Sequence, residues 1–106
     1  MIVMNDFIKL LSQINNNATA ASDIPLPPVK KVIFYNDDFT TMDFVVTILI
    51  SVFNKSEVTA EQLMREIHET GSTCVGEYTY DIAVSRKNLA TQVARENGFP
   101  LRIEIE

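Results

Sequence analysis

The sequence predicts an α+β domain with the element order β-α-α-β-α-β, in which three helices pack on one face of a small three-stranded antiparallel sheet. A β-branched and aromatic run at 32–35 leads into a polar loop and then into an apolar segment, which indicates a strand followed by a helix. Threonine capping signals precede two further helical segments, and a glycine follows each of them. The last residues, 101–106, alternate between apolar and polar side chains, as in a strand with one buried face.

The first strand and the first helix are joined by a polar loop, 36–39. We expect the strand over 30–35. We expect Thr40 to cap the helix through its hydroxyl, with Asp43 three residues later as the acidic partner. Segment 44–53 is apolar on nearly all sides, so its periodicity fits either a buried helix or a strand. Its length and the threonine cap favour the helix.

The second helix has clear signals at both ends. Thr59 and Gln62 form a capping box at its start, and Gly71 stands at its C-terminal exit. Met64 and His68 are four residues apart, so they share one face of the helix. An ion pair between Glu61 and Arg65 is expected on the exposed side, and the apolar face comprises Leu63, Met64 and Ile67.

A strand over 73–79 and a third helix over 80–96 are expected next, with Thr79 as the cap between them. Asn97 and Gly98 end this helix, and Pro100 prevents its continuation. Its inward-facing residues are expected to be Ile82, Ala83, Leu89, Ala90, Val93 and Ala94.

Composition excludes several classes of function. The chain has 106 residues and one cysteine, Cys74, so it suits a single domain without an internal disulfide or a cysteine-rich metal site. Its net charge of −5 argues against nucleic acid as a partner. The longest apolar run, 44–53, is too short to span a bilayer, so no membrane partner is expected.

Residues 1–28 are expected to form a flexible N-terminal extension, followed by a core domain over 29–106. Four apolar residues at helical spacing allow a short amphipathic helix with Asn5 as its cap, and three prolines stiffen the end of the segment. The extension is either a terminus without a role or a tether for a partner. It resembles neither a signal peptide nor a transit peptide, so we expect the bacterial cytoplasm rather than a plastid stroma. The apolar residues are Phe7, Leu10, Leu11 and Ile14.

The sequence favours binding over catalysis. The loop after the first strand superficially resembles the D-x-D-x-T loop of haloacid-dehalogenase-type phosphatases, but Asn36 occupies the position of the nucleophile. No serine elbow and no glycine-rich phosphate loop is present, and a single histidine offers too few ligands for a metal. We therefore expect no enzyme activity, no catalytic residue, no metal and no cofactor.

Asn36, Asp38 and His68 offer acceptor atoms that suit an ammonium group. Met42 and Met64 are soft apolar groups of the kind that fits varied side chains. An ammonium beside an apolar slot describes the first residue of a peptide with a free N-terminus. The same residues also fit a plainer interpretation, in which the loop is an ordinary turn, the histidine lies at the surface and the methionines belong to the core.

Over 29–106 the chain resembles the ClpS adaptor family, whose members recognise N-degrons and pass them to an AAA+ unfoldase of the Clp protease. Four motifs carry this resemblance in combination. They are N-D-D-[aromatic]-T-x-M-[acid]-F-V from Asn36, L-M-x-x-I-H-x-x-G from Leu63, Y-T at Tyr78, and P-L at Pro100.

The resemblance implies an adaptor that binds N-degron peptides with Leu, Phe, Tyr or Trp at the N-terminus, and that docks as a monomer on the N-terminal domain of a ClpA- or ClpC-type unfoldase. A protein-interaction domain without N-terminal selectivity is the alternative. The residues carried over are Asn36, Asp38 and His68 for the α-amino group, Asp37 and Thr40 for the pocket rim, Met42, Val45, Met64 and Leu101 for the hydrophobic pocket, and Asp81 and Arg86 for unfoldase docking.

Three positions depart from the family pattern. Thr41 stands where many members have proline, Arg86 replaces a lysine, and Val84 replaces a common glutamate. The last two positions belong to the docking surface, and Thr41 lies at the start of the predicted helix. The resemblance also implies that the extension, 1–28, takes part in substrate delivery.

Overall fold

The structure, a computed structural model, describes residues 26–106. The helix predicted from Phe7 to Ile14 lies outside these residues, and so does most of the predicted extension. The described chain has the element order β-α-α-β-α-β, so the predicted α+β fold is confirmed.

The sheet has three strands in the order β2-β1-β3, and both pairings are antiparallel. The central strand β1 is Val29–Tyr35, and its neighbours are β2, Ser72–Thr79, and β3, Arg102–Ile105. Tyr35 pairs with Ser72 on one side and with Arg102 on the other. The C-terminal end of β1 therefore lies beside the start of β2 and the start of β3.

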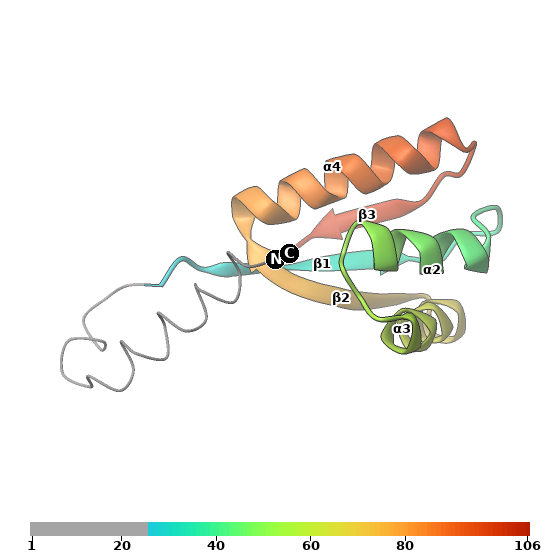
Figure 1. Ribbon diagram of the computed structural model, residues 1–106, viewed down its shortest axis with the longest axis horizontal. Coiled ribbons are helices and arrows are strands. Elements are labelled where there is room, and N and C mark those ends of the chain that lie inside the picture. Colours follow the sequence, from blue (N-terminus) through green and yellow to red (C-terminus); the bar gives the residue numbers. More distant parts are fainter. Residues whose placement is uncertain (1–25) are drawn as a thin grey trace.

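Three helices cover one face of this sheet (Figure 1). They are α2, Met42–Ser51, α3, Glu57–Thr70, and α4, Tyr80–Glu96. In Figure 1, α2 and α4 run roughly along the direction of the strands, whereas α3 is seen almost end-on beside β2. Segment 44–53 is thus mainly a helix, as its length predicted.

The core lies between the helices and one face of the sheet. Val32 and Phe34 of β1 are fully buried, and the ring of Phe34 meets Phe53 edge to face at a centroid distance of 5.3 Å. Aromatic pairs in this geometry contribute beyond their buried area. Within residues 26–106 no polar or charged residue is buried, so hydrophobic burial is the main term that stabilises the domain.

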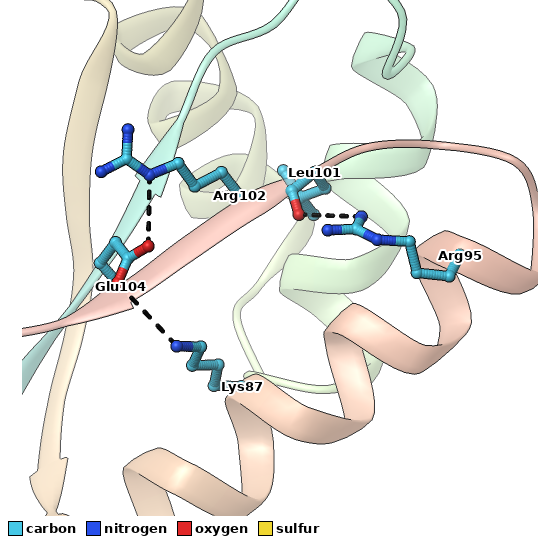
Figure 2. Close-up of polar contacts among 5 residues, drawn as sticks. All are labelled: Lys87, Arg95, Leu101, Arg102 and Glu104. Carbon is cyan, nitrogen blue, oxygen red and sulfur yellow. Dashed lines mark hydrogen bonds and ion pairs between the residues drawn. The ribbon is translucent and has the colours of Figure 1, made fainter.

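The opposite face of the sheet carries polar side chains at its β3 edge. The Arg102 guanidinium lies 4.2 Å from the centre of the Tyr35 ring, and its Nε is 3.2 Å from Glu104 Oε1. Figure 2 shows the contact between Arg102 and Glu104, together with two contacts made by residues of α4. From α4, Lys87 Nζ lies 4.0 Å from Glu104 Oε2, and the Arg95 guanidinium donates to the Leu101 carbonyl at 3.1 Å.

Two predicted helix caps were wrong by one turn or less. The residue that caps α2 is Thr41 and not Thr40, because Thr41 Oγ1 accepts from the Phe44 N–H at 3.2 Å. Thr40 donates its hydroxyl to Asp37 instead. The residue that caps α3 is Ser56, whose hydroxyl accepts from the Thr59 N–H at 3.2 Å. The helix therefore begins three residues before the predicted capping box, because an earlier serine offers the same acceptor.

The predicted inward face of α4 was partly wrong. Ala83, Ala90 and Ala94 are fully buried, but Ile82 is 44% exposed and Leu89 is 51% exposed. Small residues at the contact let a helix approach a neighbouring layer closely, so the alanine stripe faces the sheet and the larger residues flank it.

The structure confirms the two helix ends that were predicted from a glycine, at the ends of α3 and α4. Gly71 has φ of +95° and ends α3 in a left-handed conformation, and its N–H donates to the Ile67 carbonyl. Gly98 has φ of +77° after α4. No atom lies within 4 Å of a Cβ placed at either position, so backbone strain is the only cost of a side chain there.

We expect Gly71→Ala and Gly98→Ala each to lower the free energy of unfolding by about 1–2 kcal/mol, because alanine avoids the left-handed region. Urea denaturation of both variants measures the effect. An alanine variant as stable as the wild type would contradict the assigned backbone strain at that glycine.

Candidate functional site

The candidate site lies where the end of β1, the start of α2 and the end of α3 meet. The Asn36 N–H donates to the Gly71 carbonyl at 2.9 Å, which continues the β1–β2 pairing by one residue. His68 lies in the last turn of α3, just before Gly71. The hydrogen bond between Asn36 and Gly71 therefore brings the loop after β1 close to the His68 imidazole.

A cavity of about 330 Å³ opens at this junction. Asn36, Asp38 and His68, the three residues predicted to hold an ammonium group, all line it. The complete lining is Asn36, Asp37, Asp38, Phe39, Thr40, Thr41, Met42 and His68.

Asp37 fixes the loop that forms one wall of the cavity. Its Oδ1 accepts from the N–H groups of Phe39 at 2.8 Å and Thr40 at 2.6 Å, and its Oδ2 accepts from the Thr40 hydroxyl at 2.7 Å. Partial burial raises the pKa of this carboxyl, but these hydrogen bonds and the nearby Arg95 charge outweigh it and leave the pKa below its usual value. The ionised form of Asp37 therefore holds the loop in place.

The three predicted ammonium ligands keep their polar atoms free. Asn36, Asp38 and His68 are all exposed. Among residues 26–106, their side chains take part in no hydrogen bond and no ion pair. A carboxylate, an amide oxygen and a neutral imidazole are then available as acceptors for one ligand with several donors.

The apolar part of the predicted pocket is only partly at the cavity. Met42 lines it and is 47% exposed. Val45 is 6% exposed and Leu101 is 1% exposed, so both belong to the core, and Met64 is half-buried against that core. None of these three residues lines the cavity, and their predicted contact with a ligand stays a prediction.

Sequence reasoning gave no binding role to two lining residues, Phe39 and Thr41. Phe39 is 74% exposed. The signal for it was its position directly after Asp38 in the same short loop. Thr41 serves mainly as the cap of α2 and reaches the cavity because the helix begins there.

The two predicted docking residues differ in their surroundings. Asp81 is exposed in the first turn of α4. Arg86 is half-buried: it donates to the Val52 carbonyl at the end of α2, and its guanidinium lies 5.4 Å from the centre of the Tyr78 ring. Arg86 thus links α4 to α2 and β2. Its predicted role in docking is not tested by these contacts and stays a prediction.

A second cavity, of about 430 Å³, lies at the opposite end of the sheet. Its lining mixes two lysines with two glutamates and includes Tyr80 at the start of α4. None of the residues predicted to bind a ligand lines it.

Within 26–106 the structure gathers no group of three potential metal ligands. Over the same residues, every helix is too short or too polar to cross a membrane.

The model of the family described as ATP-dependent Clp protease adaptor protein ClpS matches residues 26–104. The chain belongs to the ClpS family. Its curated ClpS relatives are named adapter proteins of the ATP-dependent Clp protease, so the chain is an adaptor of that protease and not an enzyme. The family resemblance seen in the sequence is confirmed.

The relatives match most of both chains. A ClpS from Treponema denticola is 50% identical over 80 residues, which cover 76% of this chain and 79% of that protein. A ClpS from Acetivibrio thermocellus is 49% identical over 84 residues, which cover 79% of this chain and 85% of that protein. A ClpS from Clostridium acetobutylicum aligns over 96 residues with 38% identity, covering 91% of this chain and 95% of that protein.

The ClpS fold is also found among solved structures. Agrobacterium tumefaciens ClpS2, solved bound to L-phenylalaninamide, superposes with a TM-score of 0.73 and 38% sequence identity. The match covers 76% of this chain and 98% of that one.

We expect Asp37→Ala to lower the free energy of unfolding by about 1–2 kcal/mol near neutral pH, because three hydrogen bonds lose their acceptor. Folding lowers the pKa of Asp37, so its contribution is present above the usual aspartate pKa and is lost as pH falls through the folded-state value. The difference in stability between wild type and variant should therefore shrink between about pH 5 and pH 2. Denaturant titrations across that range measure it, and a difference independent of pH would contradict the assignment.

We expect Arg86→Ala to lower the free energy of unfolding by about 1–2 kcal/mol, because the end of α2 loses its link to α4 and the Tyr78 ring loses its cover. Arg65→Ala is the matched control: its 3.6 Å pair with Glu61 lies at the surface of one helix, and such pairs contribute little. Thermal unfolding of both variants makes the comparison, and equal stabilities would contradict the internal role of Arg86.

Proposed function

We propose that this ClpS adaptor binds the free N-terminal residue of N-degron proteins, with Leu, Phe, Tyr or Trp in first position, and delivers them to a ClpA- or ClpC-type AAA+ unfoldase. The observation that carries the proposal is the meeting of Asn36, Asp38 and His68 at one cavity. These side chains come from two segments far apart in the sequence, and each keeps its acceptor free.

The charge of the cavity suits an α-ammonium group. Asp38 supplies a negative charge, the Asn36 amide supplies a neutral oxygen, and a neutral His68 supplies a ring nitrogen. An ammonium has three donors, so it matches the three acceptors that line this one cavity. Asp37 serves mainly to hold the loop, because its oxygens accept three hydrogen bonds from Phe39 and Thr40.

The size of the cavity suits a single side chain with its backbone. A volume of about 330 Å³ lies at the lower end of the range for ligand pockets. Met42 gives the cavity an unbranched, adaptable apolar wall, which fits side chains of different shape. None of the other residues predicted for the hydrophobic pocket lines the cavity, and we propose that a bound side chain nevertheless reaches them: they are Val45 and Leu101 of the core and Met64 packed against it.

Agrobacterium tumefaciens ClpS2 supports the same ligand class, because its structure holds L-phenylalaninamide. That molecule has a free α-amino group, an aromatic side chain and an amide in place of a carboxylate. It therefore stands for the first residue of a polypeptide with phenylalanine at its N-terminus.

The expected affinity is moderate. Burying one large apolar side chain contributes about 1.5–3 kcal/mol. Each charge-assisted hydrogen bond to the ammonium contributes about 1.5–3 kcal/mol before the cost of association. The sum suits a Kd of roughly micromolar order, about −8 kcal/mol. Such a complex is selective yet releases its cargo readily.

Delivery requires a second surface, separate from the cavity. We propose that Asp81 and Arg86 on α4 contact the N-terminal domain of the unfoldase, and that residues 1–28 take part in transfer of the substrate. The adaptor would act as a monomer in the bacterial cytoplasm. A protein-interaction domain without N-terminal selectivity remains the alternative, and it predicts equal binding of free and acetylated peptides.

We expect Asp38→Ala and His68→Ala each to weaken binding of a Phe-initiated peptide at least tenfold, since each loses about 1.5–3 kcal/mol of hydrogen bonding to the ammonium. Asp43→Ala is the matched control, because this acid is exposed on α2 in the same region but does not line the cavity. Fluorescence anisotropy measures the affinities, and circular dichroism checks that all three variants fold.

The wild type should also discriminate strongly against the same peptide with an acetylated N-terminus, because the acetyl group removes the charge. Unchanged affinity in both Asp38→Ala and His68→Ala would refute the assigned ammonium site. Equal binding of free and acetylated peptides would favour the interaction domain without N-terminal selectivity.

A further inference from the structure

The side chain of Phe39 lies outside the hydrophobic core and pairs with no aromatic ring among the described residues. It is 74% exposed, more than any other large hydrophobic residue between 26 and 106. The other four phenylalanines of that range each pair with an aromatic ring: Phe34 with Phe53, and Phe44 with Phe99. A large apolar ring left in water contributes little to folding, so its position calls for another explanation.

The backbone around Phe39 is nevertheless held firmly. Its own N–H donates to Asp37 Oδ1 at 2.8 Å, and the next N–H, from Thr40, donates to the same oxygen at 2.6 Å. The ring can therefore move only about its two side-chain torsions. Aromatic side chains on a fixed backbone provide contact area at a low cost in conformational entropy.

Phe39 also stands at the rim of the cavity, directly after Asp38. Consecutive Cα atoms are about 3.8 Å apart, so the Cα of Phe39 lies next to that of Asp38, which is one of the proposed ammonium ligands. In an extended peptide, successive side chains point to opposite sides. When the first side chain enters the cavity, the second therefore points out of it, toward the opening, where the exposed ring of Phe39 is available for contact.

From these observations we infer that Phe39 forms a second subsite, which contacts the side chain of the second residue of the bound chain and favours a large apolar group there. A leucine in second position covers the exposed ring, whereas an alanine leaves most of it in water. Because this inference rests on the proposed function, its test must separate the second residue from the first.

The test uses two peptides with a free N-terminus that begin Phe-Leu and Phe-Ala and are otherwise identical. We expect the wild type to bind the Phe-Leu peptide about fivefold more tightly, which corresponds to about 1 kcal/mol. In Phe39→Ala the two affinities should become equal, and in Phe39→Tyr the preference should remain, because the ring is retained. Fluorescence anisotropy measures all the affinities.

Val58→Ala is the matched control, because Val58 is 67% exposed on α3 and does not line the cavity. It should keep the wild-type preference. Equal affinities of the wild type for the two peptides would overturn the inference. So would a Phe39→Ala variant that weakens both peptides by the same factor, since the ring would then contact the first residue.

The first-residue selectivity of each variant distinguishes the two levels of the proposal. Phe39→Ala should still prefer a free over an acetylated N-terminus, because Asn36, Asp38 and His68 are untouched. Loss of second-residue preference with this selectivity intact supports the subsite. A wild type without selectivity for the free N-terminus would overturn the proposed function, and the subsite with it.

Discussion

The hydrogen bond from the Asn36 N–H to the Gly71 carbonyl is the contact on which the candidate site depends. It extends the pairing of β1 and β2 beyond Tyr35 and Ser72 and holds the loop after β1 against the end of α3. Gly71 permits this arrangement because its left-handed backbone turns α3 directly into β2. His68, in the last turn of that helix, is thereby brought to Asn36 and Asp38.

Two adjacent aspartates in the loop have different tasks. Asp37 accepts three hydrogen bonds from Phe39 and Thr40, and these bonds lower the pKa of its carboxyl and fix the loop. Asp38 is exposed and engages no described residue, so its charge is available to a ligand. A preorganised loop with one free carboxylate costs less to order on binding than a flexible one. The rigidity of the site thus comes from the neighbour of the residue that binds.

The element order and the antiparallel sheet could be predicted because local signals agreed with the fold. The meeting of the three acceptors was implied by the family resemblance, since their spacing alone equally fits an ordinary turn and a surface histidine. Gly71, the alternating segment at 101–106 and the polar loop each had one physically sensible place. The errors arose where neighbouring residues offered the same chemistry. Thr40 and Thr41 can both cap a helix, and only the competing hydrogen bond from Thr40 to Asp37 decides between them.

Tertiary packing decided the remaining positions, which sequence periodicity alone does not resolve. Ile82 and Leu89 are apolar and helical in spacing, yet the alanines of α4 face the sheet. The family resemblance assigned Arg86 to a docking surface and gave no sign of its internal contacts, in which its guanidinium packs on Tyr78 and bonds to the end of α2. Phe39 had the opposite outcome: a residue type that is usually buried is displayed at the rim of the cavity.

The most direct test of the central claim is a titration of the isotope-labelled protein with L-phenylalaninamide, followed by NMR. We expect the backbone signals of residues 36–42 and the imidazole signals of His68 to shift together and to saturate, because these groups line one cavity. The signals of Lys30 and Lys87, at the second cavity, should stay in place. Shifts confined to that second cavity, or an imidazole that does not respond while the loop does, would contradict the account.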